Sequence, residues 1–297
     1  MTTLPGALSS IIHTTLSSLG DPGPIVQIQI LGGGCINHAS RIMTQNKSYF
    51  LKWNQHPYPN MFSMEAYGLN MLASINTVRV PKVIKVQESV FDVPAFILLE
   101  WIERQSTFDQ RKCGQQLALL HLKSNAEQFG LEYDNFIGST PQNNNWHSDW
   151  ITFFREERLK PQIDLAQKNG LCGQSRRLKL DKLMTQLEKW LAGVERKTSL
   201  LHGDLWGGNV IGDQNGNPVL IDPAVYYGDR EADVAFTQMF GGFSRDFYQA
   251  YMEAYPLESG YQDRFEIYNV YHLLNHLNLF GESYGHSLDT TLRRWVG

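Results

Sequence analysis

The stretch that decides the fold is LLHGDLWGGNVIGDQNGNPVLIDPA, residues 200–224. It contains Asp204 and, after the four residues Leu-Trp-Gly-Gly, Asn209. Two short apolar runs then flank a polar turn, and the second run ends at Asp222. This pattern predicts a β-hairpin that brings Asp222 back beside Asn209. Oxygen-bearing side chains that meet at one place suit a hard cation and the phosphates that it carries, so the stretch predicts a phosphoryl-transfer site.

The spacing of Asp204 and Asn209 is the one by which kinase catalytic loops place a base and a magnesium ligand on one turn. Only residues 223–229 separate Asp222 from a helix that we expect to start at Arg230. Protein kinases carry a long activation segment at this point, on which a peptide docks. We therefore expect the acceptor to be a small molecule, or a small group that protrudes from something larger.

The composition sets limits on the class of protein. A chain of 297 residues with 42% hydrophobic content is long enough for one large core or for two lobes. The formal net charge of -4 gives no basic surface for nucleic acid or an anionic membrane, so we expect neither partner. Cys35, Cys113 and Cys172 are an odd number at wide spacing, which predicts no disulfide framework. The lack of a signal peptide and of a membrane-spanning run leads us to expect a cytoplasmic protein.

The first hundred residues predict a helix followed by strands. The helix should cover residues 8–19, and the strands should cover residues 25–31, 39–43, 49–53, 83–86 and 96–100. Gly32, Gly33 and Gly34 lie between the first two strands, where glycine lets backbone N–H groups run close to an anionic ligand, although an ordinary turn explains them equally well. Lys52 lies within an apolar strand, and a helix expected over residues 61–74 offers Glu65.

A strand lysine held by a helix glutamate, so that it meets the α- and β-phosphates of ATP, is the arrangement of a kinase small lobe. The alternative for Lys52 and Glu65 is a surface lysine and a solvated glutamate. The run FILLEWIE then predicts a hinge, where the backbone of Glu100, Trp101 and Ile102 would bond the adenine edge. We place the N-terminal ATP-binding lobe at residues 1–101.

Residues 102–297 predict a larger lobe with the catalytic loop and the acceptor site. Helices are expected over residues 109–123, 150–169, 175–191, 244–254 and 264–280. Residues 134–149 are polar and aperiodic, and we interpret them as a surface loop near the cleft mouth. The predicted fold class is α+β: a bilobal protein-kinase-like fold, with a small lobe of a five-stranded antiparallel sheet plus helix and a larger, mainly helical lobe.

Several motifs then occur in one order along most of the chain. They are GGGCINHA at 32–39, HGDLWGGN at 202–209, DPAVYYGDREAD at 222–233, FGGF at 240–243 and YHLLNHLNLFG at 271–281. With these motifs the sequence resembles the fructosamine-kinase (ketosamine-3-kinase) family, relatives of aminoglycoside phosphotransferases. HGDLWGGN followed by DPA is specific to that resemblance, whereas HGD with a later aspartate would fit any phosphotransferase of this class.

The resemblance implies ATP-dependent phosphorylation of the sugar 3-hydroxyl of ketosamines, the rearranged glycation adducts on amines. The phosphorylated adduct is unstable and leaves, which restores the amine and repairs the protein. By position, Asp204 would orient the acceptor hydroxyl and accept its proton, while Asn209 and Asp222 would hold Mg²⁺ against the β- and γ-phosphates. Lys52 and the amides of residues 32–34 would neutralise the remaining phosphate charge.

Other residues have two interpretations each. Trp206 would pack on the apolar side of a sugar or its linker, or else belong to the core. His202 and Asp233 would brace the catalytic loop through hydrogen bonds, with a solvated surface acid as the alternative for Asp233. Cys35 would be a redox switch, able to bridge two subunits, or simply a small residue that fits a tight loop.

His272 and His276 lie one helical turn apart, and because no third ligand is evident we expect a packed pair rather than a metal site.

Two other functions share much of this pattern. One is a phosphotransferase for another small hydroxyl compound, aminoglycoside-like or choline-like. The other is an ATP-binding pseudokinase that acts as a scaffold, which the complete set of expected catalytic residues disfavours: Lys52, Glu65, Asp204, Asn209 and Asp222. The sequence leaves open the preferred ketose (fructosamine, ribulosamine or erythrulosamine) and whether the amine is protein-bound. It also leaves open a monomer or a redox-dependent dimer.

Overall fold

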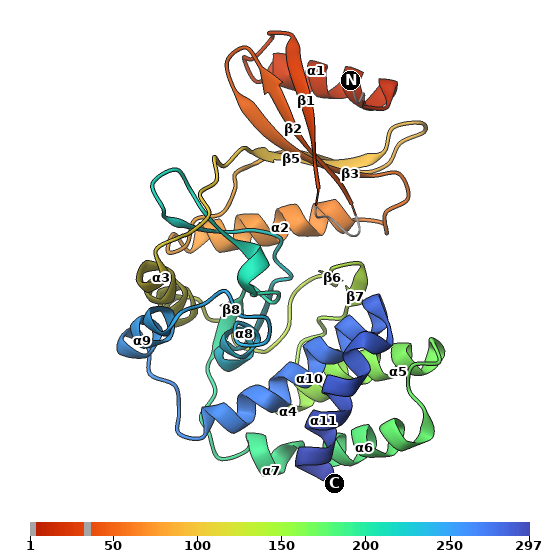
Figure 1. Ribbon diagram of the computed structural model, residues 1–297, viewed down its shortest axis with the longest axis vertical. Helices are drawn as coiled ribbons and strands as arrows, with labels where there is room; N and C mark the ends of the chain where they lie inside the picture. Colours follow the sequence, from red (N-terminus) through yellow and green to blue (C-terminus); the bar gives the residue numbers. More distant parts are fainter. Residues whose placement is uncertain (1–3, 33–36) are drawn as a thin grey trace.

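The computed structural model describes residues 4–32 and 37–297 of the chain. Figure 1 shows a small lobe, built around one sheet, above a larger helical lobe. The predicted bilobal α+β architecture with a kinase-like fold is confirmed. The predictions for Gly33, Gly34 and Cys35 concern positions outside the described residues. Over the described ranges, no helix combines the length and the apolar character that crossing a membrane requires.

The small lobe holds a five-stranded antiparallel sheet in the order β1-β2-β3-β5-β4. Its strands are β1 (Ile25–Leu31), β2 (His38–Thr44), β3 (Ser48–Asn54), β4 (Val83–Gln87) and β5 (Ala95–Glu100). Two helices cover its opposite faces, α1 (Gly6–Ser18) and α2 (Met61–Ser74). Because β5 ends at Glu100, we propose the boundary between the lobes at residue 101.

Strand β5 lies between these two helical layers. Phe96 and Leu98 belong to the apolar cluster that contains α1, whereas Ala95, Ile97 and Leu99 belong to the cluster that contains α2. Successive side chains of a strand point to opposite faces. A strand that is covered on both faces therefore reads as a continuous apolar run, and this explains the sequence AFILL.

The same alternation fixes the direction of Lys52 on the neighbouring strand β3. Leu51 packs in the cluster on the α1 side, so Lys52 faces the α2 side of the sheet. Its backbone pairs with Ile97 of β5 and with Ala39 of β2. The lysine thus comes from the middle of the sheet, where the strand register leaves its side chain little freedom of direction.

The large lobe consists mainly of helices. They are α3 (Gln110–Lys123), α4 (Trp150–Phe153), a π-helical segment (Phe154–Leu159), α5 (Lys160–Lys168), α6 (Gln174–Thr185), α7 (Leu187–Leu191), α8 (Arg230–Phe236), α9 (Arg245–Ala254), α10 (Tyr261–Phe280) and α11 (Gly285–Val296). Short antiparallel pairs join β6 (Asn135–Ile137) to β7 (Thr140–Gln142), β8 (Thr198–Leu201) to β11 (Tyr226–Asp229), and β9 (Val210–Gly212) to β10 (Pro218–Leu220).

One helix prediction for this lobe was wrong, and one helix was missed. The helix expected over residues 175–191 is broken at Gln186 into α6 and α7, with neither glycine nor proline to mark the break. Helix α11 was not predicted, although Leu288, Leu292 and Val296 are buried at helical spacing. The remaining expected helices are present, and α10 starts at Tyr261, about one turn before the predicted residue.

The interpretation of residues 134–149 as a surface loop near the cleft mouth was wrong in part: residues 135–138 do line the cleft, but the segment is neither a simple loop nor wholly at the surface. This segment contains the β6–β7 hairpin, and Asn135, Gln142 and Asn144 are buried. Asn135 donates to the carbonyl of Val225 at 2.7 Å, and Gln142 donates to the carbonyl of Ala224 at 3.0 Å. These amides satisfy buried backbone carbonyls, which would otherwise lack partners. The polar composition therefore reflects internal hydrogen bonding to the segment after Asp222.

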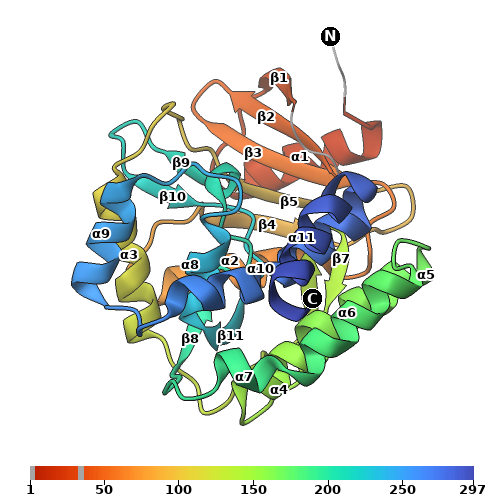
Figure 2. The ribbon, with the colours of Figure 1, turned by 60° about the horizontal axis from the view of Figure 1, so that its bottom comes forward.

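Helices α3 and α9 lie side by side at one edge of the molecule (Figure 2). Gly114 makes this close approach possible, since a Cβ atom there would lie 2.2 Å from the carbonyl oxygen of Phe247. We expect Gly114→Ala to lower the free energy of unfolding by roughly 1–3 kcal/mol, because overpacking forces the helices apart. Thermal unfolding measures this. Gly6→Ala in α1 is the control, because nothing lies within 4 Å of its added Cβ; equal melting temperatures for the two variants would contradict the interpretation.

Candidate active site

A cleft of about 780 Å³ lies between the two lobes. Every predicted nucleotide, metal and acceptor residue within the described ranges lines it: Gly32, Lys52, Glu65, Glu100, Trp101, Ile102, Asp204, Trp206, Asn209 and Asp222. The structure thus brings together residues from both lobes and from opposite ends of the chain. The predicted supporting residues His202 and Asp233 are buried beneath this surface.

The catalytic loop runs from the end of β8 into a 3₁₀ turn, Gly207–Asn209. Gly203 has a φ of +79°, and a Cβ atom there would lie 2.0 Å from the carbonyl oxygen of Ala224. Only glycine fits that close approach. Asn209 donates from Nδ2 to the Asp204 carboxylate at 2.8 Å and to its backbone carbonyl at 2.8 Å. The amide therefore fixes the direction in which the Asp204 carboxylate faces the cleft.

The surroundings of Asp204 change the pKa of its carboxyl group. Burial raises the pKa of this carboxyl well above its usual range, and the negative charges of Asp222 and Asp233 act in the same direction. The hydrogen bond from Asn209 opposes the shift but does not cancel it. A carboxylate with a raised pKa is a better proton acceptor than an ordinary surface aspartate.

Lys52 joins the two lobes across the cleft. Its Nζ lies 3.0 and 3.1 Å from the carboxylate oxygens of Glu65, and 3.0 Å from Oδ1 of Asp222. Burial alone would lower the pKa of Lys52, but the charges of Asp222 and Glu65 outweigh it and raise that pKa. The lysine is therefore a fixed positive charge between the small-lobe helix and the hairpin of the large lobe.

Asp222 follows strand β10, and the β9–β10 hairpin returns it beside Asn209 as predicted. The Ile221 backbone N–H donates to the Asn209 carbonyl at 3.0 Å. Asp222 itself has a φ of 54°, an uncommon conformation for a residue other than glycine, and its side chain is about half exposed to the cleft.

The side chains of Asn209 and Asp222 could hold a magnesium ion, because Mg²⁺ is usually bound by one or two protein oxygens together with substrate phosphates and water. No group of three or more histidine, cysteine or acidic residues with metal-site geometry occurs among the described residues. Asn209 and Asp222 together supply two side chains with oxygen donors, which fits a metal ion that also binds the phosphates of a nucleotide.

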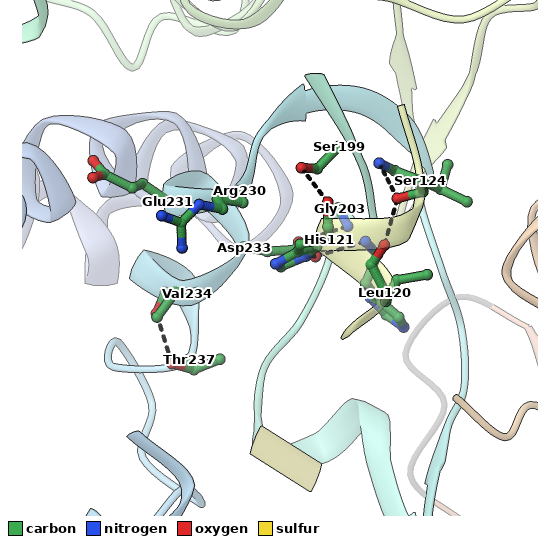
Figure 3. A network of polar contacts seen from close by, with 12 residues as sticks. Leu120, His121, Ser124, Ser199, Gly203, Arg230, Glu231, Asp233, Val234 and Thr237 are labelled. Carbon is green, nitrogen blue, oxygen red and sulfur yellow. Dashed lines mark hydrogen bonds and ion pairs between the residues drawn. The ribbon is translucent and has the colours of Figure 1, made fainter. Parts of the chain in front are cut away.

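The carboxylate of Asp233 stabilises the loop that carries Asp204 through hydrogen bonds, and Figure 3 shows it beside Gly203 and His121. The carboxylate accepts the backbone N–H groups of His202 at 2.7 Å and of Gly203 at 2.8 Å, and it contacts Nε2 of His121 at 3.2 Å. Only 2% of Asp233 is exposed, which excludes the alternative of a solvated surface acid. Its position in the first turn of α8 also suits a negative charge.

His202 contributes through both ring nitrogens. Its Nε2 lies 3.0 Å from the carbonyl of Ile221, and because a carbonyl only accepts, Nε2 carries the proton. The Asp204 backbone N–H donates to the other nitrogen, Nδ1, at 3.3 Å. Burial lowers the pKa of His202, so the ring is neutral and holds the loop rather than moving protons.

The predicted hinge residues are not equivalent. The Glu100 side chain is engaged with Arg79 at 3.0 Å and with the Lys82 backbone N–H at 3.2 Å. Trp101 donates from its indole N–H to Glu103 at 2.8 Å. The Glu100 backbone N–H donates to the Lys82 carbonyl at 2.9 Å, whereas within the described ranges the backbone groups of Trp101 and Ile102 have no hydrogen-bond partner, and both residues line the cleft. The backbone groups of Trp101 and Ile102 are therefore free to pair with an adenine edge.

Arg79 was missed by the sequence analysis. Besides Glu100, its guanidinium contacts Asp213 at the tip of the β9–β10 hairpin, and its carbonyl accepts the Leu220 N–H at 2.9 Å. Burial would raise the pKa of Asp213, but hydrogen bonds from Asn217 lower it to about 2, so Asp213 is ionised. Arg79 thus ties the hinge to the hairpin that ends in Asp222, and no sequence motif marks it.

Three aromatic residues near the predicted Trp206 were also missed. Trp206 meets one of them, Phe240, edge to face at a centroid distance of 5.9 Å, and the other two, Phe280 and Tyr284, also line the cleft. The FGGF motif was the available signal. Gly207 and Gly242 touch backbone to backbone, and a Cβ atom on Gly242 would lie 2.7 Å from the Cα of Gly207.

The ring of His272 stacks on Phe236 at a centroid distance of 3.5 Å, as expected for a packed residue.

These features define a class of protein. A five-stranded lobe carries a lysine paired with a helix glutamate, a helical lobe carries an aspartate and an asparagine on one loop, and a hairpin adds a further aspartate. This is the fold and site of a kinase-like phosphotransferase.

The family follows from comparison with known proteins. The family model of fructosamine kinase matches residues 8–296, and the chain belongs to that family. It is 42% identical over 271 residues to a probable ketoamine kinase of Lactiplantibacillus plantarum, covering 91% of this chain and 95% of the relative. It is 41% identical over 270 residues to the chloroplastic protein-ribulosamine 3-kinase of Arabidopsis thaliana, covering 89% of this chain and 81% of the relative.

A solved structure gives the same picture. The structure of a candidate fructosamine-3-kinase from Haemophilus somnus 129PT superposes with a TM-score of 0.87 at 31% identity, covering 96% of this chain and 97% of that chain.

The role of Asp233 can be tested by removing its charge. We expect Asp233→Asn to lower stability by roughly 1.5–3 kcal/mol, because an amide oxygen replaces a carboxylate that accepts two buried backbone N–H groups. Chemical denaturation measures this. The control is Asp263→Asn, an exposed acid in the first turn of α10. A variant as stable as the parent would show that the loop does not depend on this charge.

The raised pKa of Asp204 predicts a pH-dependent effect on stability. The folded protein holds this proton where the unfolded chain has lost it, so ionisation of Asp204 costs stability as pH rises above the ordinary value of 3.8. Asp204→Asn removes that cost. Its melting temperature relative to the parent should therefore increase from about pH 4 upward and level off above the raised pKa.

Melting curves across the pH range measure this difference, with the same substitution at an exposed aspartate, Asp246→Asn, as the control. A variant that is less stable than the parent by the same amount at every pH would contradict the assignment of a raised pKa.

Proposed function

We propose that this protein transfers the γ-phosphoryl group of ATP to the 3-hydroxyl of a ketosamine. The observation that carries the proposal is the placement of Asp204 at a cleft where Lys52 pairs with both Glu65 and Asp222. The names of the relatives, a ketoamine kinase and a protein-ribulosamine 3-kinase, support the acceptor class.

In the proposed reaction, a bond forms between the acceptor oxygen and the γ-phosphorus while the bond from that phosphorus to the oxygen of ADP breaks. The hydroxyl proton passes to the carboxylate of Asp204, whose raised pKa suits it to receive the proton. Asn209 keeps that carboxylate aimed at the acceptor through its 2.8 Å hydrogen bond. When bound, Mg²⁺ would supply charge neutralisation for the phosphates.

The nucleotide would be held by residues of both lobes. The free backbone groups of Trp101 and Ile102 would pair with the adenine edge. Lys52 would contact phosphate oxygens while Glu65 keeps it in place, and Asn209 and Asp222 would hold the metal. The amides of Gly32 to Gly34 complete the phosphate contacts in this proposal, with Gly32 alone among the described residues.

The acceptor side favours a small group. The segment after Asp222 forms strand β11 and leads directly into α8, so it offers no platform for an extended peptide. Trp206 is 37% exposed at the cleft, and its ring would pack on a sugar or its linker. Loss of the phosphorylated sugar would then restore the amine, which makes deglycation the proposed outcome of the reaction.

An acceptor panel tests the proposal directly. We expect ADP release with lysine-linked fructose, ribulose or erythrulose, and much less with choline or an aminoglycoside. Asp204→Asn should lower kcat by about 10²–10⁴-fold with ATP binding retained, because the proton acceptor is lost.

If the protein preferred choline or an aminoglycoside, the proposal of a ketosamine acceptor would be wrong. Near-normal turnover by Asp204→Asn would reject the role of that residue, and nucleotide binding without turnover of any acceptor would favour a scaffold.

A further inference from the structure

The cleft has an aromatic end, defined here as Trp206, Phe240, His276, Phe280 and Tyr284, all of which line it. The rings form a connected group. Phe240 lies 4.9 Å from His276 between ring centroids, and Tyr284 lies 5.0 Å from His276. Trp206, Phe240 and Phe280 are each more than one-third exposed, at 37%, 40% and 46%. Exposed aromatic groups gathered on one concave surface indicate a binding site rather than a core.

The hydrogen bonding of His276 shows which of its two ring nitrogens carries the proton. Its Nδ1 lies 2.8 Å from the backbone carbonyl of His272. Because a carbonyl only accepts, Nδ1 must carry the proton, and in the neutral ring Nε2 is then an acceptor. Burial lowers the pKa of His276, which keeps the ring neutral. Within the described residues nothing bonds to Nε2, and it is not among the enclosed polar atoms, so it is open to a molecule in the cleft.

The charges of the cleft lie elsewhere. The acidic residues among its described lining are Glu65, Glu100, Asp204 and Asp222. Glu65 and Asp222 form ion pairs with Lys52, and Glu100 forms one with Arg79. The aromatic end contains neither a carboxylate nor a lysine or arginine. It offers negatively polarised ring faces and one lone pair, a combination that suits a cation carrying an N–H donor.

We propose that the aromatic end binds the protonated secondary amine of the acceptor, with Nε2 of His276 accepting an N–H and the rings of Phe240 and Tyr284 facing the positive charge. This proposal rests on the proposed function, because it is the ketosamine that carries such an amine beside its sugar. It explains why a kinase for an amine adduct needs no dedicated carboxylate at its acceptor end: aromatic faces and a neutral acceptor select a cation. The amine would be recognised as a charge, and the linker beyond it would remain free to vary.

The main alternative is that the rings only pack on the apolar faces of the sugar or the linker. The two ideas differ in their response to charge. An acceptor in which an ether oxygen replaces the amine nitrogen keeps the sugar, the linker and the shape, but it removes the charge and the donor. Pure apolar packing predicts equal use of both compounds, whereas recognition of the cation predicts a preference for the amine.

The experiment compares kcat/KM for a lysine-linked ketosamine and for its ether analogue. We expect the parent protein to prefer the amine by roughly tenfold or more, the size of effect that a desolvated cation over aromatic faces produces. His276→Phe keeps the ring and removes the acceptor, so the KM for the ketosamine should rise by about tenfold with the KM for ATP unchanged. Tyr284→Leu should reduce the preference for the amine by removing one ring face.

The control is His286→Phe, a substitution on the exposed side of α11 away from the cleft, which should leave both acceptors unaffected. Equal kcat/KM for amine and ether in the parent, or an unchanged ratio in both His276→Phe and Tyr284→Leu, would overturn the inference while leaving the proposed function intact. Absence of turnover with every ketosamine would instead refute the proposed function. In that case the affinities of the two compounds, measured by calorimetry, decide the inference separately.

Discussion

The site depends on one buried anion, the carboxylate of Asp233. It accepts the backbone N–H groups of His202 and Gly203 at 2.7 and 2.8 Å, so the turn that presents Asp204 is held from inside the large lobe. A buried carboxylate is stable only when hydrogen bonds replace its hydration, and the two N–H groups need an acceptor for the same reason. Each therefore compensates the other. The carbonyl of His202 in turn accepts the Ala224 N–H at 2.8 Å, which carries the constraint to the segment that holds Asp222.

The contacts across the cleft differ in how easily they can be exchanged. Glu65 is about one-tenth exposed, whereas the side chain of Asp222 is 45% exposed. An exposed ion pair contributes little because water screens it, so phosphate oxygens or a metal can compete for Lys52 and Asp222 at small cost. The buried partner Glu65 keeps the lysine in place during that exchange. Arg79 adds a link at the hinge, so the hairpin that bears Asp222 is tied to the small lobe on two sides.

Much of this arrangement could be predicted from local patterns. Strand alternation placed Lys52, helical spacing gave α2 its observed bounds, and the hairpin turn brought Asp222 beside Asn209. The errors have a common cause. Composition does not reveal whether an amide faces water or a buried carbonyl, so residues 134–149 resembled a surface loop. Arg79 and the aromatic end come from segments far apart in sequence, and no local period reports contacts of that kind.

The aromatic end and the proposed metal ligand Asn209 are not independent, because the contact between Gly207 and Gly242 holds the two parts of the site together. Gly207 touches Gly242 backbone to backbone, and this contact sets Trp206 against Phe240. The same 3₁₀ turn continues to Asn209, whose amide positions the Asp204 carboxylate. A side chain at either glycine would separate the two loops and move Asn209 as well as the rings. Acceptor selectivity can therefore vary through the rings themselves, while the backbone that carries them is fixed by the requirements of phosphoryl transfer.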